Sequence, residues 1–371
     1  MLEIYIEMKN IPTLKLIILY FLTVLVSCSN DESSEYYTPS VSPVNYNLEA
    51  FPYNTLSDYN LFEGDLQNQK PVLGVIPYKP ISALFTDYAK KKRFLWMPNN
   101  TSANFVSDYE ILDFPVGTIL VKTFYYTNVL PSNTTKIIET RLLIKKSSGW
   151  IFSEYVWNED QTEAFLDNTG STVNIEWLEG GISKSTNYRI PSESECRTCH
   201  KIGNVPFPIG VKPQNLNSDY PYPQEGSVNQ LQKLIIEGYL NPVDYSNVNT
   251  VVDWKDVSKP LQLRARSYLD INCAHCHSDD SHCSYRPIRL SFHDTETSDA
   301  NLGICVVPDE DVNSTLTHII SPGRSERSVL SYRMNSTEES TKMPLIGRNL
   351  VDDQAISLIN DWIDGLIQTC E

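Results

Sequence analysis

The chain has 371 residues, of which 41% are hydrophobic and 20% charged, a composition that excludes collagen-like, disordered and multi-span membrane proteins. At roughly 150 residues per domain, this length predicts two or three domains. The formal net charge of −16 disfavours nucleic-acid binding, because the phosphate backbone would be repelled, and favours partners with basic or neutral docking faces.

The N-terminal segment has the form of an export signal. Lys9 and Lys15 precede an apolar run at 16–26 that is shorter than the roughly 20 residues needed to span a bilayer. The run ends in Leu-Val-Ser-Cys28, which resembles a bacterial lipobox and predicts that residues 1–27 are removed and Cys28 is lipidated. An uncleaved anchor and a plain secretory signal are the alternatives. We therefore expect an exported lipoprotein, anchored on the periplasmic side or at the cell surface.

A polar, acidic stretch follows Cys28, so residues 28–60 are expected to form a flexible tether and lead-in. Residues 61–185 are predicted to form a β-rich domain because they contain four runs rich in β-branched and aromatic residues, at 118–126, 136–145, 149–157 and 172–178. Leu142, Leu143 and Ile144 are consecutive apolar residues within one of these runs, which favours a strand covered on both faces and hence an antiparallel sandwich-like fold.

Residues 186–371 are expected to be mainly α-helical. Apolar residues recur at helical spacing after Ser227, between Pro260 and Cys273, and from Asp352 to Ile367. The overall prediction is a multidomain α+β protein, with a β-sandwich-like domain followed by a first unit at 186–250 and a second at 251–371.

Two pentapeptides carry the chemistry, Cys196-Arg-Thr-Cys199-His200 and Cys273-Ala-His-Cys276-His277. Each is a C-x-x-C-H motif, the attachment signature of c-type haem, in which two thiols bond the porphyrin and the histidine ligates the iron. A zinc site built from the two cysteine pairs is the rival. It is disfavoured because the 74 positions between Cys199 and Cys273 far exceed the roughly 15 to 20 of common zinc motifs.

The other axial ligands differ between the two motifs. Met343 follows the second motif and precedes the last predicted helix, so His277 and Met343 are expected to be an axial pair, with Met334 as the competitor. The stretch between His200 and Cys273 contains neither Met nor His. The sixth ligand of the first iron is therefore either missing or imported from one of five residues elsewhere: Met97, His282, His293, His318 or Met334.

Three cysteines and one basic run remain. An exported chain permits a disulfide between Cys283 and Cys305, and the sequence favours its presence and its absence equally. Cys370 would then have no partner. The run Lys90-Lys-Lys-Arg93 is interpreted as a solvated turn, with a docking patch or a contact to haem propionates as alternatives.

The phrases around the motifs resemble a family of bacterial two-haem c-type cytochromes with an N-terminal β-rich domain. They include Tyr188-Arg-Ile-Pro191, Tyr268-Leu-Asp-Ile-Asn272 and Lys342-Met-Pro-Leu-Ile-Gly-Arg348, together with Phe114-Pro-Val-Gly-Thr118 and Tyr155-Val-Trp-Asn-Glu-Asp-Gln161. The resemblance implies two covalent haems and electron transfer, and it assigns no role to the β-rich domain.

The expected function is therefore electron transfer between a donor and an acceptor protein through two covalent haems. The alternative is a dihaem peroxidase- or oxidase-like enzyme in which the haem on Cys196 and Cys199 keeps an open position. A surface binding module with accessory haems is a third, weaker hypothesis.

Overall fold

The computed structural model describes residues 41–370. The expected signal peptide, the lipidation site Cys28 and part of the expected tether lie outside these residues. The rest of the tether is not free: Phe51, Leu56 and Tyr59 are buried in a hydrophobic core. The expectation of an unpacked lead-in is therefore wrong for residues 41–60, because their large apolar side chains cover one face of the sheet.

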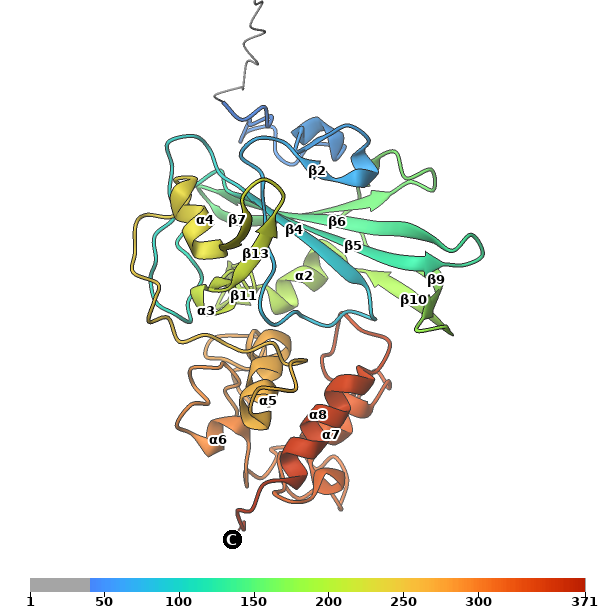
Figure 1. The fold of residues 1–371 in the computed structure, drawn as a ribbon. Helices are drawn as coiled ribbons and strands as arrows, with labels where there is room; N and C mark the ends of the chain where they lie inside the picture. The colour runs from blue at the N-terminus through green and yellow to red at the C-terminus, as the bar shows by residue number, and fades with distance from the viewer. Residues whose placement is uncertain (1–40, 371) are drawn as a thin grey trace, which may run out of the picture. The chain divides into compact units, whose positions relative to one another are not determined.

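One eight-stranded antiparallel sheet dominates the structure (Figure 1). Strands β5 to β8 follow one another as neighbours, β4 pairs with the other side of β5, and the hairpin of β9 and β10 joins the far end of β5 at the pair Val129 and Trp177. The strands are β3 (Ile76–Pro77), β4 (Lys90–Trp96), β5 (Ile119–Val129), β6 (Thr134–Lys146), β7 (Gly149–Trp157), β8 (Ala164–Leu166), β9 (Ser171–Glu179) and β10 (Ile182–Ile190). The four predicted strands are confirmed as β5, β6, β7 and β9.

Both faces of this sheet are covered, but not by a second sheet. Leu142 and Ile144 pack into one core, beneath the segment 44–75, whereas Leu143 faces a second core that segments 103–114 and 211–240 complete. The prediction of a strand covered on both faces is confirmed. The prediction of a sandwich is wrong, because loops and short helices, rather than a second sheet, cover the two faces. In the described residues the other sheets are two-stranded hairpins: β1 (Phe62–Glu63) with β2 (Lys70–Pro71), β11 (Lys201–Ile202) with β12 (Val205–Pro206), and β13 (Asp219–Tyr222) with β14 (Gly226–Asn229).

The basic run is not a turn. Lys90 to Arg93 form the first half of β4, where Arg93 is buried and pairs across the strands with Lys122 of β5. Side chains alternate along a strand, so Lys91 and Arg93 lie on the opposite face from Phe94. The charges alone suggested a solvated turn, whereas strand pairing buries Arg93 and half-buries Lys91 and Lys92.

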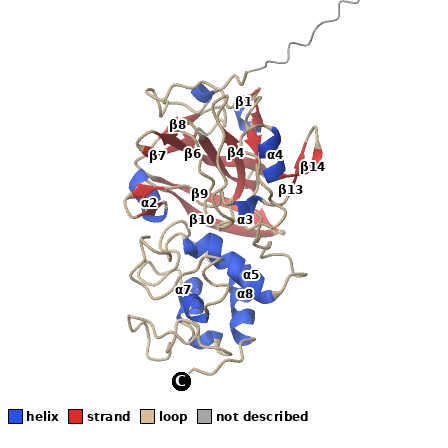
Figure 2. Cartoon of the chain, turned by 90° about the vertical axis from the view of Figure 1, so that its left-hand side faces the viewer, coloured by secondary structure: helices blue, strands red, loops and turns tan. Residues whose placement is uncertain are grey.

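The expectation of mainly helical haem domains is wrong. The described helices are α2 (Glu193–Cys199), α3 (Pro213–Leu216), α4 (Gln230–Ile236), α5 (Leu261–Leu269), α6 (Asp299–Leu302), α7 (Val329–Asn335) and α8 (Asp353–Asp364). Only α5 and α8 are longer than seven residues, and loops make up most of the chain after α2 (Figure 2). Turn-forming Ser, Asp, Asn and Pro residues interrupt the apolar periodicity there, so helices end after one or two turns.

The predicted C-terminal helix is confirmed as α8, and α5 and α8 lie side by side (Figures 1 and 2). Asp352 caps α8, since its carboxylate accepts the backbone N–H of Ala355 at 3.2 Å. Leu358, Ile359 and Trp362 are buried in the core that α5 shares. The apolar stripe therefore docks on the helix that leads into the second motif.

Residues beyond α2 are bonded directly to the sheet and its loops. Asp87, just before β4, accepts the backbone N–H groups of Asn349 and Leu350 at 2.7 and 2.8 Å. The backbone N–H of Phe85 donates to the side-chain oxygen of Asn272 at 2.8 Å. Residues from Val41 onward accordingly form one compact unit, and β10 extends across the expected domain boundary at 185.

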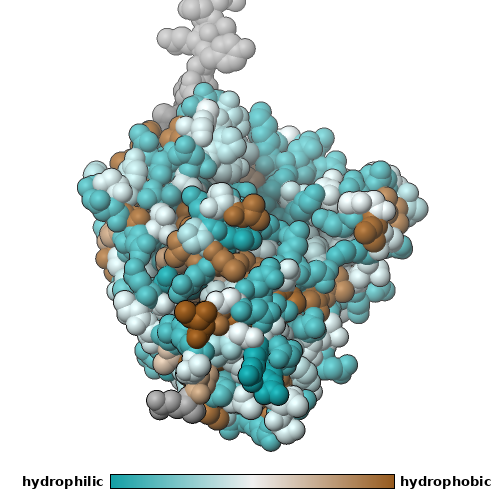
Figure 3. Space-filling view, turned by 60° about the horizontal axis from the view of Figure 1, so that its bottom comes forward, coloured by the Kyte–Doolittle hydropathy of each residue, from teal (hydrophilic) through white to brown (hydrophobic). Residues whose placement is uncertain are grey.

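The surface seen in Figure 3 is largely hydrophilic, with separate small apolar patches. Within residues 41–370, no helix has the length and apolar character required to cross a membrane.

Candidate functional site

The first motif is positioned by a short, well-capped helix. Helix α2 begins at a capping box, in which the hydroxyl of Ser192 accepts the N–H of Glu195 and the carboxylate of Glu195 accepts the N–H of Ser192. The helix ends at Cys199, and the N–H of His200 still donates to the carbonyl of Cys196 at 2.9 Å. Both thiols and the imidazole therefore lie within one helical turn, as attachment to a porphyrin requires.

His200 has the hydrogen-bonding pattern of a ligand. Its Nδ1 lies 3.1 Å from the carbonyl oxygen of Phe207, and because a carbonyl only accepts, Nδ1 carries the proton and Nε2 keeps its lone pair. Burial, with a contribution from Lys122 and His275, lowers the pKa of His200 to about 3. The imidazole is thus neutral at physiological pH and able to bind a metal.

The second motif follows a π-helical turn. Helix α5 continues into Asp270–Ala274, and the N–H groups of Cys276 and His277 both donate to the carbonyl of Cys273 at 3.0 Å. Buried Asp270 accepts the N–H of Phe292 at 3.0 Å. Such π-turns occur frequently at functional sites, where they redirect side chains at the end of a helix.

His277 faces a mostly apolar pocket. Its lining includes Ile288, Leu290 and Ile319, and both candidate thioethers, Met334 and Met343. Burial lowers the pKa of His277 to about 4, and its buried Nδ1 has no hydrogen-bond partner in the described part of the chain. The structure places His277 and Met343, the expected axial pair, at one pocket. Met334 lines the same pocket, so the lining alone does not decide which methionine is the ligand.

The loop after Met343 is held by one buried arginine. The guanidinium of Arg348 donates to the carbonyls of Met343, at 2.8 Å from Nη2, and of Ser336, also at 2.8 Å. The N–H of Met343 donates to the carbonyl of Arg333 at 3.0 Å. Met343 is therefore fixed by its backbone at the rim of the pocket, whereas Met334 is buried in the helical core.

A second pocket lies against the first motif. Cys196, Cys199 and His200 line it together with four cationic residues: Lys122, Arg141, Arg189 and Arg348. Burial and neighbouring cations lower the pKa of Lys122 well below its usual value. The Cys196 thiol is buried here and donates to Glu154 at 3.0 Å, and burial raises its pKa.

None of the five expected sources of a sixth ligand lines this pocket. Met97 is fully buried in the core under segment 103–114, Met334 belongs to the other pocket, and His293 stacks on Tyr109 with ring centroids 3.8 Å apart. His318 bonds Thr317, and His282 is exposed. His275 is a further imidazole that lines this pocket and could offer a ring nitrogen as a ligand atom.

The two motifs meet, which their separation in sequence did not indicate. The sulfur atoms of Cys199 and Cys276 are 3.9 Å apart, and with His275 they form a group whose ligand atoms all lie within 4.8 Å of one another. The Cys276 thiol and His275 hold the pKa of the Cys199 thiol well below its usual value. Such a group could bind a soft metal ion, although a closed structural zinc site takes four ligands and only three converge here among the described residues.

His275 is the site residue that the sequence reading missed. The available signal was the second histidine inside the pentapeptide Cys273-Ala-His-Cys-His277. The motif assigns a role only to its final histidine, so the pattern alone indicates none for His275.

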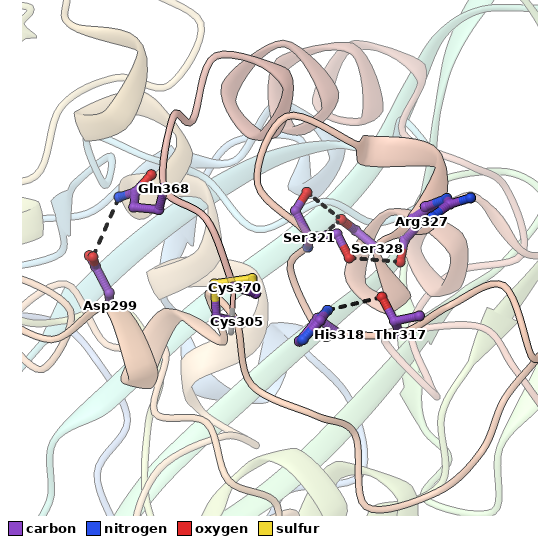
Figure 4. Close-up of a disulfide and its surroundings, with 9 residues drawn as sticks. All are labelled: Asp299, Cys305, Thr317, His318, Ser321, Arg327, Ser328, Gln368 and Cys370. Carbon is purple, nitrogen blue, oxygen red and sulfur yellow. Dashed lines mark hydrogen bonds between the residues drawn. A yellow bond between two sulfur atoms is a disulfide. The ribbon is translucent and has the colours of Figure 1, made fainter.

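The predicted disulfide between Cys283 and Cys305 is wrong. Cys305 instead pairs with Cys370, with Cα atoms 5.2 Å apart (Figure 4), and Cys283 is a buried free thiol. Beyond α8 the chain returns to Cys305, and Gln368 donates to Asp299 at 3.4 Å beside the bond. Proximity in sequence favoured Cys283, whereas the docking of α8 brings the C-terminal tail to Cys305.

No family model, no curated protein and no solved structure matches this chain.

Proposed function

We propose that this protein is an exported electron-transfer protein that binds two covalent c-type haems. The observation that carries the proposal is that each C-x-x-C-H motif combines a half-buried, neutral histidine with a pocket of its own. Cys196, Cys199 and His200 would hold one haem. Cys273, Cys276 and His277 would hold the other.

The residues present fit such a group. In the first motif the orientation of His200 leaves Nε2 free for iron. In the second, an apolar pocket lined by His277 and Met343 suits an imidazole and thioether pair, which favours the reduced metal and hence a higher potential. A bound haem supplies reversible one-electron chemistry, and the chain tunes it through ligands and burial.

The proximity of the motifs supports transfer within one chain. The attachment sulfurs of Cys199 and Cys276 are 3.9 Å apart, so two groups bonded there would be close neighbours. An electron could enter at one motif and leave at the other. The net charge of −16 would favour basic or neutral partners and make their association fall with ionic strength.

A haem enzyme of the peroxidase or oxidase type is the second candidate. It is favoured by one observation: none of the expected sixth ligands lines the pocket of the first motif. The group of Cys199, His275 and Cys276 supports a third candidate, a soft-metal site. A metal bound there would exclude full attachment of both haems, because it would use the sulfur atoms of Cys199 and Cys276.

Export and lipidation at Cys28 are part of the proposal. The disulfide between Cys305 and Cys370 supports them, because disulfides persist in oxidising compartments. The choice between the periplasmic side and the cell surface depends on the host's sorting machinery.

The test is the haem and metal content of the purified mature protein, with optical and paramagnetic resonance spectra of both oxidation states. Two covalent haems, both low-spin, would support the electron carrier. One high-spin haem that shifts on adding cyanide would favour the enzyme. Bound zinc without haem would refute both. The double variants C196S/C199S and C273S/C276S should each lose one haem and serve as matched controls for the two sites.

A further inference from the structure

A row of charged residues crosses the face of the sheet that borders the first motif. Arg93 of β4 pairs in register with Lys122 of β5, Lys122 with Arg141 of β6, and Arg141 with Glu154 of β7. Three adjacent members are cations. Like charges directly opposite one another in a sheet are destabilising, so the row needs compensating negative charge.

The neighbouring acids compensate only one of these cations. The guanidinium of Arg141 lies 2.5 Å from Glu139 and 3.1 Å from Glu154, and both carboxylates are buried around it. The amine of Lys122 has no carboxylate within ion-pair distance and no hydrogen bond among residues 41–370, and it lies 4.9 Å from the centre of the Phe124 ring.

A second cation of the same pocket, Arg348, also has no ion-pair partner in the described chain. Arg348 lines the same cavity and is buried, and its hydrogen bonds go to backbone carbonyls rather than to any carboxylate. Arg189 is neutralised by Glu195 at 2.8 Å. Two cations without an ion-pair partner in the described chain, Lys122 and Arg348, therefore line one pocket.

The nearest other acids are committed elsewhere. Asp87 accepts two backbone N–H groups of the loop after Arg348, and Asp352 caps α8. Glu154 accepts the thiol of Cys196. None of these carboxylates forms an ion pair with Lys122 in the described chain, although Oδ2 of Asp352 has no hydrogen-bond partner there.

We propose that this pocket binds the carboxylate or related oxyanion group of a ligand, with Lys122 as the principal contact and Arg348 as the second. An ammonium and a guanidinium facing one cavity match a ligand that carries two acidic groups. Two sources have this chemistry. One is the pair of propionates of a haem attached to Cys196 and Cys199, which rests on the proposed function. The other is a free small oxyanion, which does not.

The experiment compares Lys122→Gln with Lys90→Gln in the mature full chain. The control removes the same charge from the exposed end of β4, where the amine of Lys90 bonds only Thr127, at 2.8 Å. Haem content, the midpoint potential of each haem, and calorimetric titration with acetate and with inorganic phosphate are measured for each variant. Lys122→Arg keeps the charge and should restore the wild-type values.

If propionates occupy the pocket, Lys122→Gln lowers the potential of the first haem only, because a nearby cation stabilises the reduced state, and neither anion binds. If a free oxyanion occupies it, the wild type binds acetate or phosphate saturably and Lys122→Gln weakens binding about ten- to a hundred-fold, the loss expected for a charged hydrogen bond. Lys90→Gln changes neither quantity.

The inference is wrong if the wild type binds neither anion and Lys122→Gln and Lys90→Gln have the same potentials. A protein without haem would refute the proposed function and leave the titrations as the test of the pocket. If Lys122→Gln does not fold, the same comparison is made with Lys122→Arg and Lys122→Met. Wild-type binding of phosphate needs no variant.

Discussion

Asp87 is the residue whose removal should most directly loosen the loop that carries Met343. Its Oδ1 accepts the backbone N–H groups of Asn349 and Leu350 at 2.7 and 2.8 Å, and its Oδ2 accepts the hydroxyl of Thr186 at 3.3 Å. The side chain is 2% exposed. Asp87→Ala therefore removes an acceptor that water can replace only by entering the core.

The expected loss follows from the two orphaned backbone donors. An unsatisfied buried donor costs ~1–3 kcal/mol, so the two donors should lower the free energy of unfolding of Asp87→Ala by about 2–6 kcal/mol, a large fraction of the ~5–15 kcal/mol of a typical domain. Asp87→Asn is the matched control, because its amide oxygen can accept both N–H groups and asparagine tolerates the φ of 43° at this position. It should cost less than about 1.5 kcal/mol, the net worth of one ordinary hydrogen bond.

Urea denaturation at neutral pH measures both variants, and a change in midpoint at constant slope isolates stability. In the haem-loaded protein, Asp87→Ala should also weaken the optical band of sulfur-to-iron ligation, since Met343 lies at the start of the released loop. Equal midpoints for Asp87→Ala and wild type would refute the reasoning. A loss in Asp87→Asn as large as in Asp87→Ala would show that the charge, not the acceptor, matters.

Three further predictions concern the C-terminal region and the buried ion pair. Reducing the Cys305–Cys370 bond, which spans 65 positions, should lower the free energy of unfolding by about 4 kcal/mol by the chain-entropy relation. The urea midpoint of wild type should therefore fall on reduction, and Cys305→Ser should show the same lower midpoint without reductant. Met343→Leu should lower the potential of the second haem while Met334→Leu leaves it unchanged and costs less than about 1.5 kcal/mol in stability; equal potentials in redox titration would remove Met343 as the ligand. Burial, with a second carboxylate sharing the guanidinium of Arg141, raises the pKa of Glu154 to about 8, so the folded state holds a proton that the unfolded state releases from pH ~4.5 upward. The contribution of Glu154 to stability should therefore fall as pH rises from about 4.5 to 8, so the urea midpoints of wild type should fall relative to those of Glu154→Gln across that range.

Residues that act through local pattern were predictable from the sequence, because the pattern itself is the cause. β-Branched and aromatic runs gave β5, β6, β7 and β9 close to their observed limits. The apolar residues at helical spacing after Asp352 predicted α8 and the face of it that is buried. The C-x-x-C-H spacing identified both pentapeptides without any knowledge of the fold.

The features that the sequence did not predict are those set by contacts between segments far apart in the chain. Leu142, Leu143 and Ile144 correctly indicated two covered faces, but a strand has the same pattern whether a sheet or a loop covers it. Cys305 had two possible partners, and only the docking of α8 selects Cys370. The motifs 74 positions apart meet because α2 follows β10 directly and Asn272, next to the second motif, bonds the loop before β4.

The cationic pocket shows the same limit at the level of single charges. In their own strands Arg93, Lys122 and Arg141 each resemble a polar residue on the solvent face of an alternating strand. The register of three strands places them in one row, and Lys122 and Arg141, although expected in solvent, line the pocket beside the first motif. The chain is acidic overall, yet at this cavity its unpaired charges are positive. The net charge therefore describes the approach of partners, whereas strand register determines the charge that the first motif experiences.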